Sequence, residues 1–337
     1  MKRIVIAGAT SGIGLEVARL CIRAGWRVGA AGRRREALEA LRAEAPGQVE
    51  TQTIDITRND APEHLGQLIE RLGGMDIYFH ASGIGSRNTA LRPDIELNTL
   101  RTNGEGFVRM VTAAFGYFRS HGGGRIAVIS SIAGTKGLGS APAYSATKRM
   151  QNTYIDALAQ LARMEGYDIR FTDIRPGFVA TPLLSGDGRY PMLMRTEKVA
   201  ARIMHILRHP RRRVVIDRRY ALMVFFWKLI PEWLWERLRR GEKITTFVPH
   251  GTTATYPKRT ASDNGNGSAG PARGRHPDRR THDQRRGRAD ERPYRHAHQR
   301  IPLQAVAGRI RALGGGAGRL GAIHARARRA DGRRTAR

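Results

Sequence analysis

The chain has 337 residues, and its formal net charge is +30. Residues 251–337 carry 21 Lys and Arg against 6 Asp and Glu, so half of the excess lies in the last quarter of the chain. The single cysteine, Cys21, excludes an intrachain disulfide and indicates a reducing compartment.

Short apolar runs alternate with helical periodicity through the first 220 residues. This alternation predicts an α/β fold, a doubly wound parallel sheet of about seven strands with helices on both faces. The predicted strands span residues 3–9, 26–31, 49–55, 76–82, 125–131, 169–177 and 213–217. Apolar residues from Ile13 to Ala24 repeat at helical spacing, which makes Cys21 a core residue. The apolar start is too short for a signal peptide, so we expect no cleavage and a cytoplasmic protein.

The stretch "IVIAGATSGIG" ends the first strand and opens the first helix, with glycines at positions 8, 12 and 14. Glycines let a backbone turn sharply and approach a pyrophosphate, and a helix N-terminus attracts the phosphate charge. The strand before and the helix after favour a Rossmann-like dinucleotide loop over a glycine turn without a ligand.

The second strand ends in "AGRRRE". At this position an enzyme specific for NAD has an acidic residue that hydrogen-bonds the ribose 2′-OH. The guanidinium groups of Arg33 and Arg34 suit a 2′-phosphate, so we expect NADP(H), with NAD less favoured. Arg35 is expected to be solvated. Asp55, at the end of the third strand, is placed to reach the adenine edge.

The stretch "RIAVISSIAGTKGLGSAPAYSATK" places Ser131 at the end of the fifth strand and Tyr144 four residues before Lys148. A spacing of four puts the tyrosine and the lysine on one helix face. Hydride transfer to a carbonyl leaves an alkoxide that needs a proton. An ammonium beside a phenol lowers its pKa toward neutrality, and a serine hydroxyl can hold the substrate oxygen.

These motifs together resemble the short-chain dehydrogenase/reductase family over about residues 1–210. The matching pieces are "GATSGIG", "DI" at 55–56, "HASG" at 80–83, "TNGEG" at 102–106, "VISSIAG" at 128–134, "YSATK" at 144–148 and "RPGFVATPL" at 175–183.

The resemblance implies a role for each matching residue. Tyr144 would be the general acid/base, Lys148 its electrostatic partner and a ribose ligand, and Ser131 the anchor of the carbonyl. Asn103 resembles the asparagine that holds a water linking the lysine to solvent. The implied cofactor contacts are Gly8, Thr10, Ser11, Gly12, Ile13, Gly14, Arg33, Arg34, Asp55, Ile56, Ala81, Ser82, Gly83, Asn103, Tyr144, Lys148, Pro176, Gly177, Val179 and Thr181. No metal is implied.

Two positions depart from the family pattern. His80, Ala81 and Ser82 stand where the family commonly has Asn-Asn-Ala, and Ala7 replaces its threonine before the first glycine. We expect His80 to be a buried, hydrogen-bonded strand residue rather than a catalytic one.

Loops near Ile132–Ser140 and Leu183–Arg195 would bound the substrate pocket. Apolar residues in the second loop favour an apolar carbonyl or alcohol substrate: Leu183, Leu184, Tyr190, Met192 and Met194. The helices around 103–119 and 144–165 resemble those through which the family forms dimers and tetramers, so we expect a homodimer or homotetramer.

The segment 218–240, "RRYALMVFFWKLIPEWLWERLRR", has an apolar run too short to span a bilayer. A lid over the cleft or a subunit contact is favoured, with peripheral membrane contact as the alternative. From about residue 258 the chain is rich in Arg, Gly and Pro without apolar periodicity, which predicts disorder. This tail has one tyrosine, Tyr294, and no aromatic residues interleaved with its arginines for stacking on bases, so we do not expect a nucleic-acid partner.

We therefore expect an NADP-binding domain over 1–217, an amphipathic extension over 218–257 and a disordered tail over 258–337. The expected activity is hydride transfer between NADP(H) and a carbonyl or alcohol. The competing interpretation is a non-catalytic NADPH sensor or partner platform on the same fold.

Overall fold

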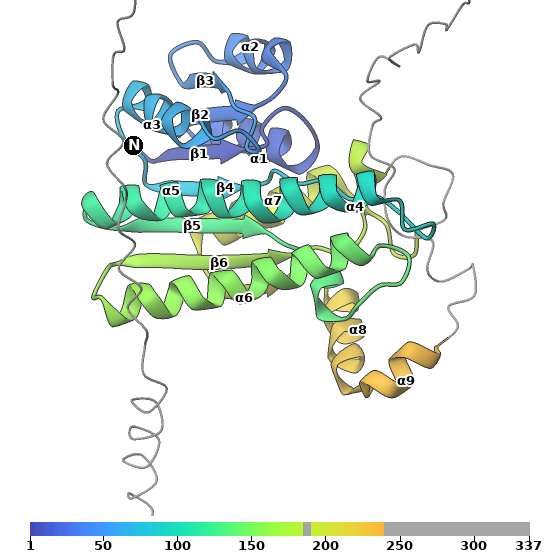
Figure 1. The fold of residues 1–337 in the computed structure, drawn as a ribbon. Helices are drawn as coiled ribbons and strands as arrows, with labels where there is room; N and C mark the ends of the chain where they lie inside the picture. Colours follow the sequence, from blue (N-terminus) through green and yellow to red (C-terminus); the bar gives the residue numbers. More distant parts are fainter. Residues whose placement is uncertain (185–189, 239–337) are drawn as a thin grey trace, which may run out of the picture. The chain divides into compact units, whose positions relative to one another are not determined.

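A computed structural model describes residues 1–184 and 190–238 of the chain. Its main sheet has seven strands in the order β3-β2-β1-β4-β5-β6-β9, and all neighbours are parallel (Figure 1). The strands are β1 (Arg3–Ala7), β2 (Arg27–Gly32), β3 (Val49–Thr53), β4 (Ile77–His80), β5 (Gly124–Ile129), β6 (Ile169–Arg175) and β9 (Arg213–Val215). The predicted doubly wound sheet is confirmed.

Several strands end earlier than the sequence pattern predicts. β1 stops at Ala7 because the backbone turns at Gly8, where φ is +95°. β5 stops at Ile129, and Ser131 instead caps the 3₁₀ turn η2 (Ile132–Thr135), its Oγ accepting from the Ala133 N–H. A second, two-stranded sheet of β7 (Val179–Ala180) and β8 (Met194–Arg195) was not predicted.

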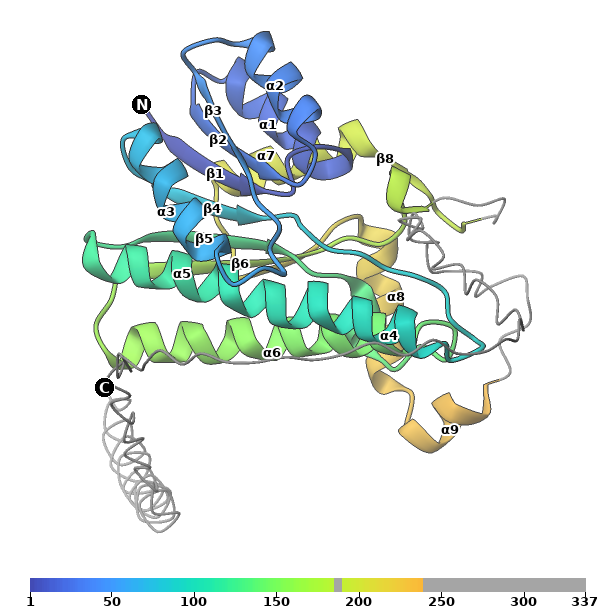
Figure 2. The same cartoon turned by 45° about the horizontal axis from the view of Figure 1, so that its top comes forward.

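Helices cover both faces of the main sheet (Figure 2). One face packs against α1, α2 and α7 through residues such as Val17, Leu38 and Ile203, and the other packs against α3, α5 and α6. Cys21 lies in the first of these cores, and burial raises the pKa of its thiol to about 12, which fits the predicted core role. The helices are α1 (Gly12–Arg23), α2 (Arg35–Glu44), α3 (Ala61–Leu72), α4 (Pro93–Leu100), α5 (Phe107–Ser120), α6 (Pro142–Met164) and α7 (Thr196–Arg208).

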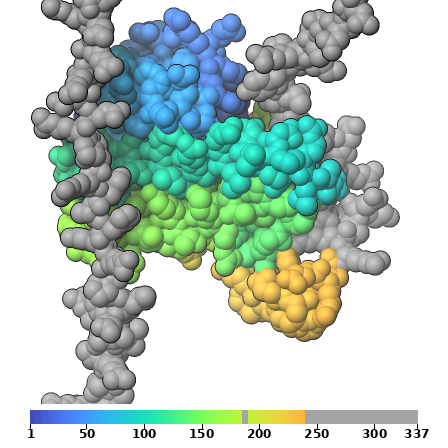
Figure 3. All heavy atoms as spheres, viewed as in Figure 1, coloured from blue at the N-terminus to red at the C-terminus, as the bar shows by residue number. Residues whose placement is uncertain are grey.

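Two further helices, α8 (Arg218–Leu229) and α9 (Glu232–Arg237), follow the last strand and form the orange lobe of Figure 3. Tyr220 anchors α8 in the core, where its hydroxyl accepts from the Phe178 N–H at 3.1 Å and donates to the Pro191 carbonyl at 2.9 Å.

The outer face of α8 carries an exposed apolar stripe at spacings of three and four residues, made of Leu222, Phe225, Phe226 and Leu229. No helix among residues 1–184 and 190–238 is long and apolar enough to cross a membrane. Contact of this stripe with a subunit or with a membrane surface stays a prediction. The predicted tail over 258–337, and the extension beyond residue 238, lie outside the described residues.

Candidate active site

The glycine loop follows β1 at the carboxyl edge of the sheet and packs against the turn after β4. The chain packs so closely there that a Cβ on Gly8 would lie 2.7 Å from the Ser82 nitrogen, and one on Gly14 would collide with the Gly8 carbonyl. Gly8 and Gly12 also have positive φ angles of +95° and +55°. The loop therefore requires glycine both for its conformation and for its close approach to the turn after β4.

Helix α1 begins at this loop with its N-terminal N–H groups available to a ligand. Ser11 is its N-cap residue, the serine side chain makes no capping hydrogen bond, and the first turn holds no acidic residue. Thr181, on the loop after β7, faces this terminus, because a Cβ on Gly12 would lie 3.3 Å from the Thr181 methyl carbon. A glycine cradle, an uncapped helix start and a facing threonine fit the pyrophosphate and nicotinamide of a dinucleotide.

The arginines after β2 lie beside the same loop. Arg34 is exposed, and its Nη2 donates to the Thr10 carbonyl at 2.9 Å and to the Thr10 hydroxyl at 3.2 Å. Arg33 is exposed next to it. Asp55 follows β3 and fixes its own turn, since its Oδ1 accepts from the Thr57 N–H and hydroxyl. The structure thus brings these basic groups next to the phosphate cradle.

The remaining predicted cofactor residues lie on α1 and on the segments that follow β3, β4 and β6. The turn after β4 contains Ala81, whose N–H donates to the Ala7 carbonyl at 2.8 Å. After β6, the Pro176 carbonyl accepts from the Ile132 N–H at 3.2 Å, and a Cβ on Gly177 would strike the Tyr220 ring. Ile13 lies in α1, Ile56 in the turn after β3, Ser82 and Gly83 in the turn after β4, and Val179 in β7.

Tyr144 and Lys148 lie one turn apart on α6, both buried, with the Lys148 Nζ 5.8 Å from the centre of the Tyr144 ring. Burial raises the pKa of Tyr144, and a hydrogen bond with the Ser131 side chain opposes that rise. The spacing of Tyr144 and Lys148 predicts a lowered Tyr144 pKa, and this prediction is wrong, because the pKa is raised. The physical reason is that burial removes the hydration of the phenolate.

Lys148 is held by neutral oxygen acceptors. Its Nζ donates to the Ile129 carbonyl at 3.2 Å and to Gln151 Oε1 at 3.0 Å. Burial lowers the pKa of Lys148 to about 8, and the nearby Asp173 carboxylate opposes that fall. Lysine therefore changes its charge here close to neutral pH, where a proton-transfer site is useful.

Asn103 lies in the π-helical turn η1 (Arg101–Gly106) that precedes α5. Its side chain accepts from the Ile84 N–H at 2.8 Å and donates to the Ile84 carbonyl at 2.6 Å. Its main-chain carbonyl accepts from Gln151 Nε2 at 2.8 Å. Gln151 was not predicted; the signal was a polar residue three positions after Lys148, on the buried face of α6.

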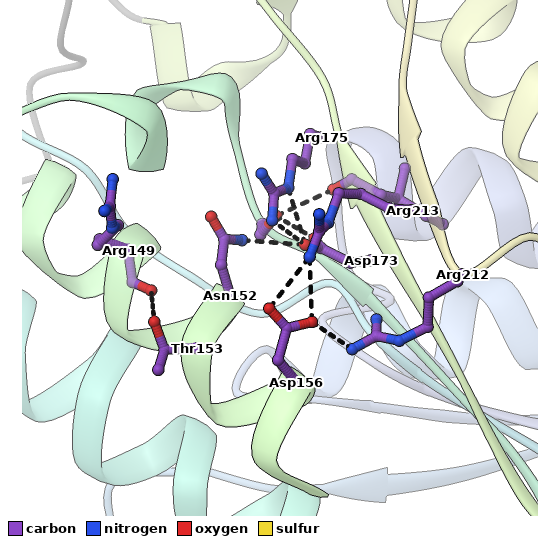
Figure 4. Close-up of polar contacts among 10 residues, drawn as sticks. Arg149, Asn152, Thr153, Asp156, Asp173, Arg175, Arg212 and Arg213 are labelled. Carbon is purple, nitrogen blue, oxygen red and sulfur yellow. Dashed lines mark hydrogen bonds and ion pairs between the residues drawn. The ribbon is translucent and has the colours of Figure 1, made fainter. Parts of the chain in front are cut away.

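Figure 4 shows a cluster of polar and charged side chains around Asp173, next to the candidate catalytic residues in the chain. Asp173, fully buried on β6, accepts from the Ser130 hydroxyl, from Asn152 at 3.2 Å and from Arg175 Nε at 2.8 Å. Ser130 precedes the candidate catalytic serine, and Asn152 lies one turn after Lys148. The cluster therefore ties β5, β6 and α6 together where the catalytic side chains arise.

The apolar surroundings of Tyr144 combine the neighbouring loop with α9, which lies about ninety residues further along the chain. Tyr144 shares a small core with Ala133, Leu138, Ala141 and Trp235 of α9. Trp235 Nε1 donates to the Gly137 carbonyl at 2.8 Å, and Lys136 Nζ donates to the Ile230 carbonyl at 2.9 Å. These contacts fix α9 over the loop that follows Ser131.

Most of the loop residues predicted to shape the substrate pocket pack onto the main core. Met194 is buried in the main core, and Tyr190, Met192 and Leu184 pack against that core beside Phe178 and Tyr220. Leu183 is about one-third exposed. These residues therefore pack the loop onto the sheet, and they carry little information on a substrate.

His80 is buried and hydrogen-bonded, as predicted. Its Nδ1 pairs with the Tyr78 hydroxyl at 3.0 Å, while its Nε2 has no partner among the described residues. Burial lowers the pKa of His80 to about 3, so the ring is neutral.

The fold and the convergence of these residues at one sheet edge define a nucleotide-binding oxidoreductase. A family model described as short chain dehydrogenase matches residues 2–189. The chain therefore belongs to the short-chain dehydrogenase/reductase family, whose members are NAD(P)-dependent oxidoreductases.

Two curated relatives agree with this assignment. An uncharacterized oxidoreductase of Myxococcus xanthus is 34% identical over 202 residues, which cover 58% of this chain and 79% of the relative. Dehydrogenase/reductase SDR family member 7B of Bos taurus is 34% identical over 193 residues, which cover 53% of this chain and 58% of the relative.

Solved structures show the same fold at lower identity. The closed form of serine dehydrogenase complexed with NADP+ superposes with a TM-score of 0.57 at 22% identity, covering 64% of this chain and 94% of that one. ElxO with NADP bound gives a TM-score of 0.57 at 21% identity, covering 66% of this chain and 99% of that one.

Proposed function

We propose that the chain is an NADP(H)-dependent carbonyl reductase or, in the opposite direction, an alcohol dehydrogenase. The observation that carries this proposal is the proximity of Ser131, Tyr144 and Lys148, with Lys148 beside the turn after β4 that packs against the glycine loop. Binding alone would need no buried phenol with a lysine one helical turn away.

When bound, the nicotinamide supplies the hydride that reaches the carbonyl carbon. The Ser131 hydroxyl, already hydrogen-bonded to Tyr144, orients the substrate oxygen. The Tyr144 hydroxyl donates its proton to that oxygen as negative charge develops, which leaves an alcohol and a phenolate.

Lys148 stabilises this phenolate. An ammonium about 4 Å from the phenolate oxygen contributes about 4 kcal/mol at an effective dielectric of about 20, equivalent to about three pKa units. This attraction acts against the desolvation that raises the pKa of Tyr144. The proposed geometry therefore needs the lysine to remain charged during turnover.

The preference for NADP(H) rests on Arg33 and Arg34. Arg34 already contacts the glycine loop through Thr10, so a 2′-phosphate beside that loop would meet guanidinium groups rather than a carboxylate. The two similar structures that carry NADP in their descriptions support this preference.

The substrate side of the proposal rests on α9. Trp235, with Leu138 and Ala141, gives the surroundings of Tyr144 an apolar character, which favours an apolar carbonyl or alcohol. We also propose a homodimer or homotetramer formed through α5 and α6. The shallow groove between these helices is lined by Leu100, Val108 and Met150, which suits a subunit contact.

The test is NADPH oxidation measured with a panel of aliphatic and aromatic carbonyls, using the wild type and Tyr144→Phe. We expect turnover by the wild type, a loss of about 10²–10⁴-fold in kcat for the variant, and equal NADPH affinity in both. NADPH binding without turnover by the wild type would instead favour the non-catalytic sensor.

A further inference from the structure

Gln151 is a fully buried amide between Lys148 and the main chain of η1. Its Oε1 accepts from Lys148 Nζ at 3.0 Å, and its Nε2 donates to the Asn103 carbonyl at 2.8 Å. Both ends of the side chain are thus hydrogen-bonded to residues of the candidate active site.

The position of Gln151 on α6 explains why it reaches this lysine. Residues 144, 148 and 151 follow one another at spacings of four and three, so all three lie on one face of the helix. A buried amide is costly unless its donor and acceptor are both satisfied, and an apolar side chain would fill the same space without that cost. The packing alone therefore gives no reason for glutamine here.

The lysine gives that reason. Its ammonium carries three N–H donors, and two of them are bound by the Ile129 carbonyl and by Gln151. The group also lies next to the turn after β4, because a Cβ on Gly83 would be 3.6 Å from Nζ. No charged group among the described residues contacts this ammonium directly. The Gln151 Oε1, on the side that faces η1, therefore holds it in place.

We propose that Gln151 is a positioning residue for the reaction, and that its amide fixes the Lys148 ammonium between η1 and the cleft. The inference rests on the proposed function and deepens it. The family resemblance implies only a water, held by Asn103, that links this lysine to solvent, whereas the Gln151 side chain joins the lysine to the Asn103 main chain directly. Because an amide N–H is not acidic, the bridge holds the lysine without passing a proton along it.

Three titratable groups surround Lys148. Tyr144 lies on the same helix, Asp173 lies on β6, and His80 lies at the end of β4. Asp173 and the neutral His80 remain in place when only residue 151 is changed. A change at Gln151 therefore reports on its contact with Lys148.

The test compares Gln151→Leu with Gln151→Glu. Leucine removes the acceptor and disfavours the ammonium, whereas glutamate adds a negative charge and favours it. We expect the alkaline limb of the kcat/KM profile to move down by about one pH unit in Gln151→Leu and up by about one unit in Gln151→Glu. A residue with only a packing role would lower activity in both variants without moving the limb in opposite directions.

A second readout needs no turnover. Titration of ¹³Cε-lysine resonances by NMR, with Lys148 assigned from Lys148→Arg, should show the same opposite shifts in the full-length protein without cofactor. Gln67→Leu, the same change in α3, where the amide donates to Glu63, should leave both readouts unchanged. Shifts in one direction only, or none, would overturn the inference. Failure of the wild type to reduce any carbonyl, with the NMR shifts present, would instead count against the proposed function.

Discussion

The two halves of the sheet contribute to the candidate site by different means. The half built from β1, β2, β3 and β4 offers mainly backbone groups: a glycine loop, an uncapped helix start and the turn after β4. The half built from β5, β6 and α6 offers buried side chains, namely Tyr144, Lys148 and the cluster around Asp173. In the proposed function, cofactor binding depends mainly on local backbone shape, whereas proton transfer depends on long-range packing.

This contrast predicts that the largest loss of stability follows a substitution in the buried cluster around Asp173. Asp173→Ala would leave Arg175 buried without its partner and should lower the free energy of unfolding by about 3–5 kcal/mol. Asp168→Ala breaks the Asp168–Arg170 pair, in which both side chains are exposed, and should cost less than about 1 kcal/mol. Urea denaturation measures both; similar losses would contradict the contrast.

The glycine loop should respond in cofactor affinity rather than in stability. In Gly14→Ala the added Cβ would push against the Gly8 carbonyl and distort the cradle. We expect NADPH affinity, measured by calorimetry, to fall about 100-fold, which is about 2.7 kcal/mol. Gly66→Ala, in α3 with open space around its Cβ, is the matched control and should bind normally. Normal binding by Gly14→Ala would show that the loop does not hold the cofactor.

The catalytic half should also lose substrate affinity when α9 is changed. Trp235→Ala removes the indole that packs beside Tyr144 and should raise KM for a bulky apolar carbonyl about tenfold, with NADPH affinity unchanged. Trp233→Ala, at a position that is 58% exposed, should leave KM unaltered. An equal effect of both changes would remove α9 from the pocket.

An effect of the same size concerns the choice of cofactor. Arg34→Glu would place a carboxylate where a 2′-phosphate is expected and should lower the preference for NADPH over NADH by about tenfold. Arg35→Glu starts from a residue of α2 that is also exposed but has no assigned role, and it should leave the preference intact. The ratio of kcat/KM values for the two cofactors decides the point.

The same contrast explains how much could be predicted from the sequence. The strands, the glycine loop and the helix with Tyr144 and Lys148 are local patterns, and all of them were found in the structure. The contact between Trp235 and the loop after Ser131 joins residues almost a hundred positions apart, so no local spacing indicates it. Gln151 and the Asp173 cluster also depend on which helix face meets which strand.

The raised pKa of Tyr144 shows a further limit of spacing arguments. The interval between Tyr144 and Lys148 correctly predicts that they share a helix face, but it does not include the cost of burying the phenol. Tertiary packing decides which of the two effects dominates. For the same reason, Tyr190, Met192 and Met194 looked like pocket residues, whereas Met194 is buried in the core and the other two pack against it.

A crystal structure with NADP+ and a bound alcohol would test the central claim most directly. The account predicts the substrate oxygen within hydrogen-bonding distance of both the Tyr144 and the Ser131 hydroxyls, with the nicotinamide on the same side of the cleft. A substrate oxygen held elsewhere, with the phenol turned away from the nicotinamide, would contradict it.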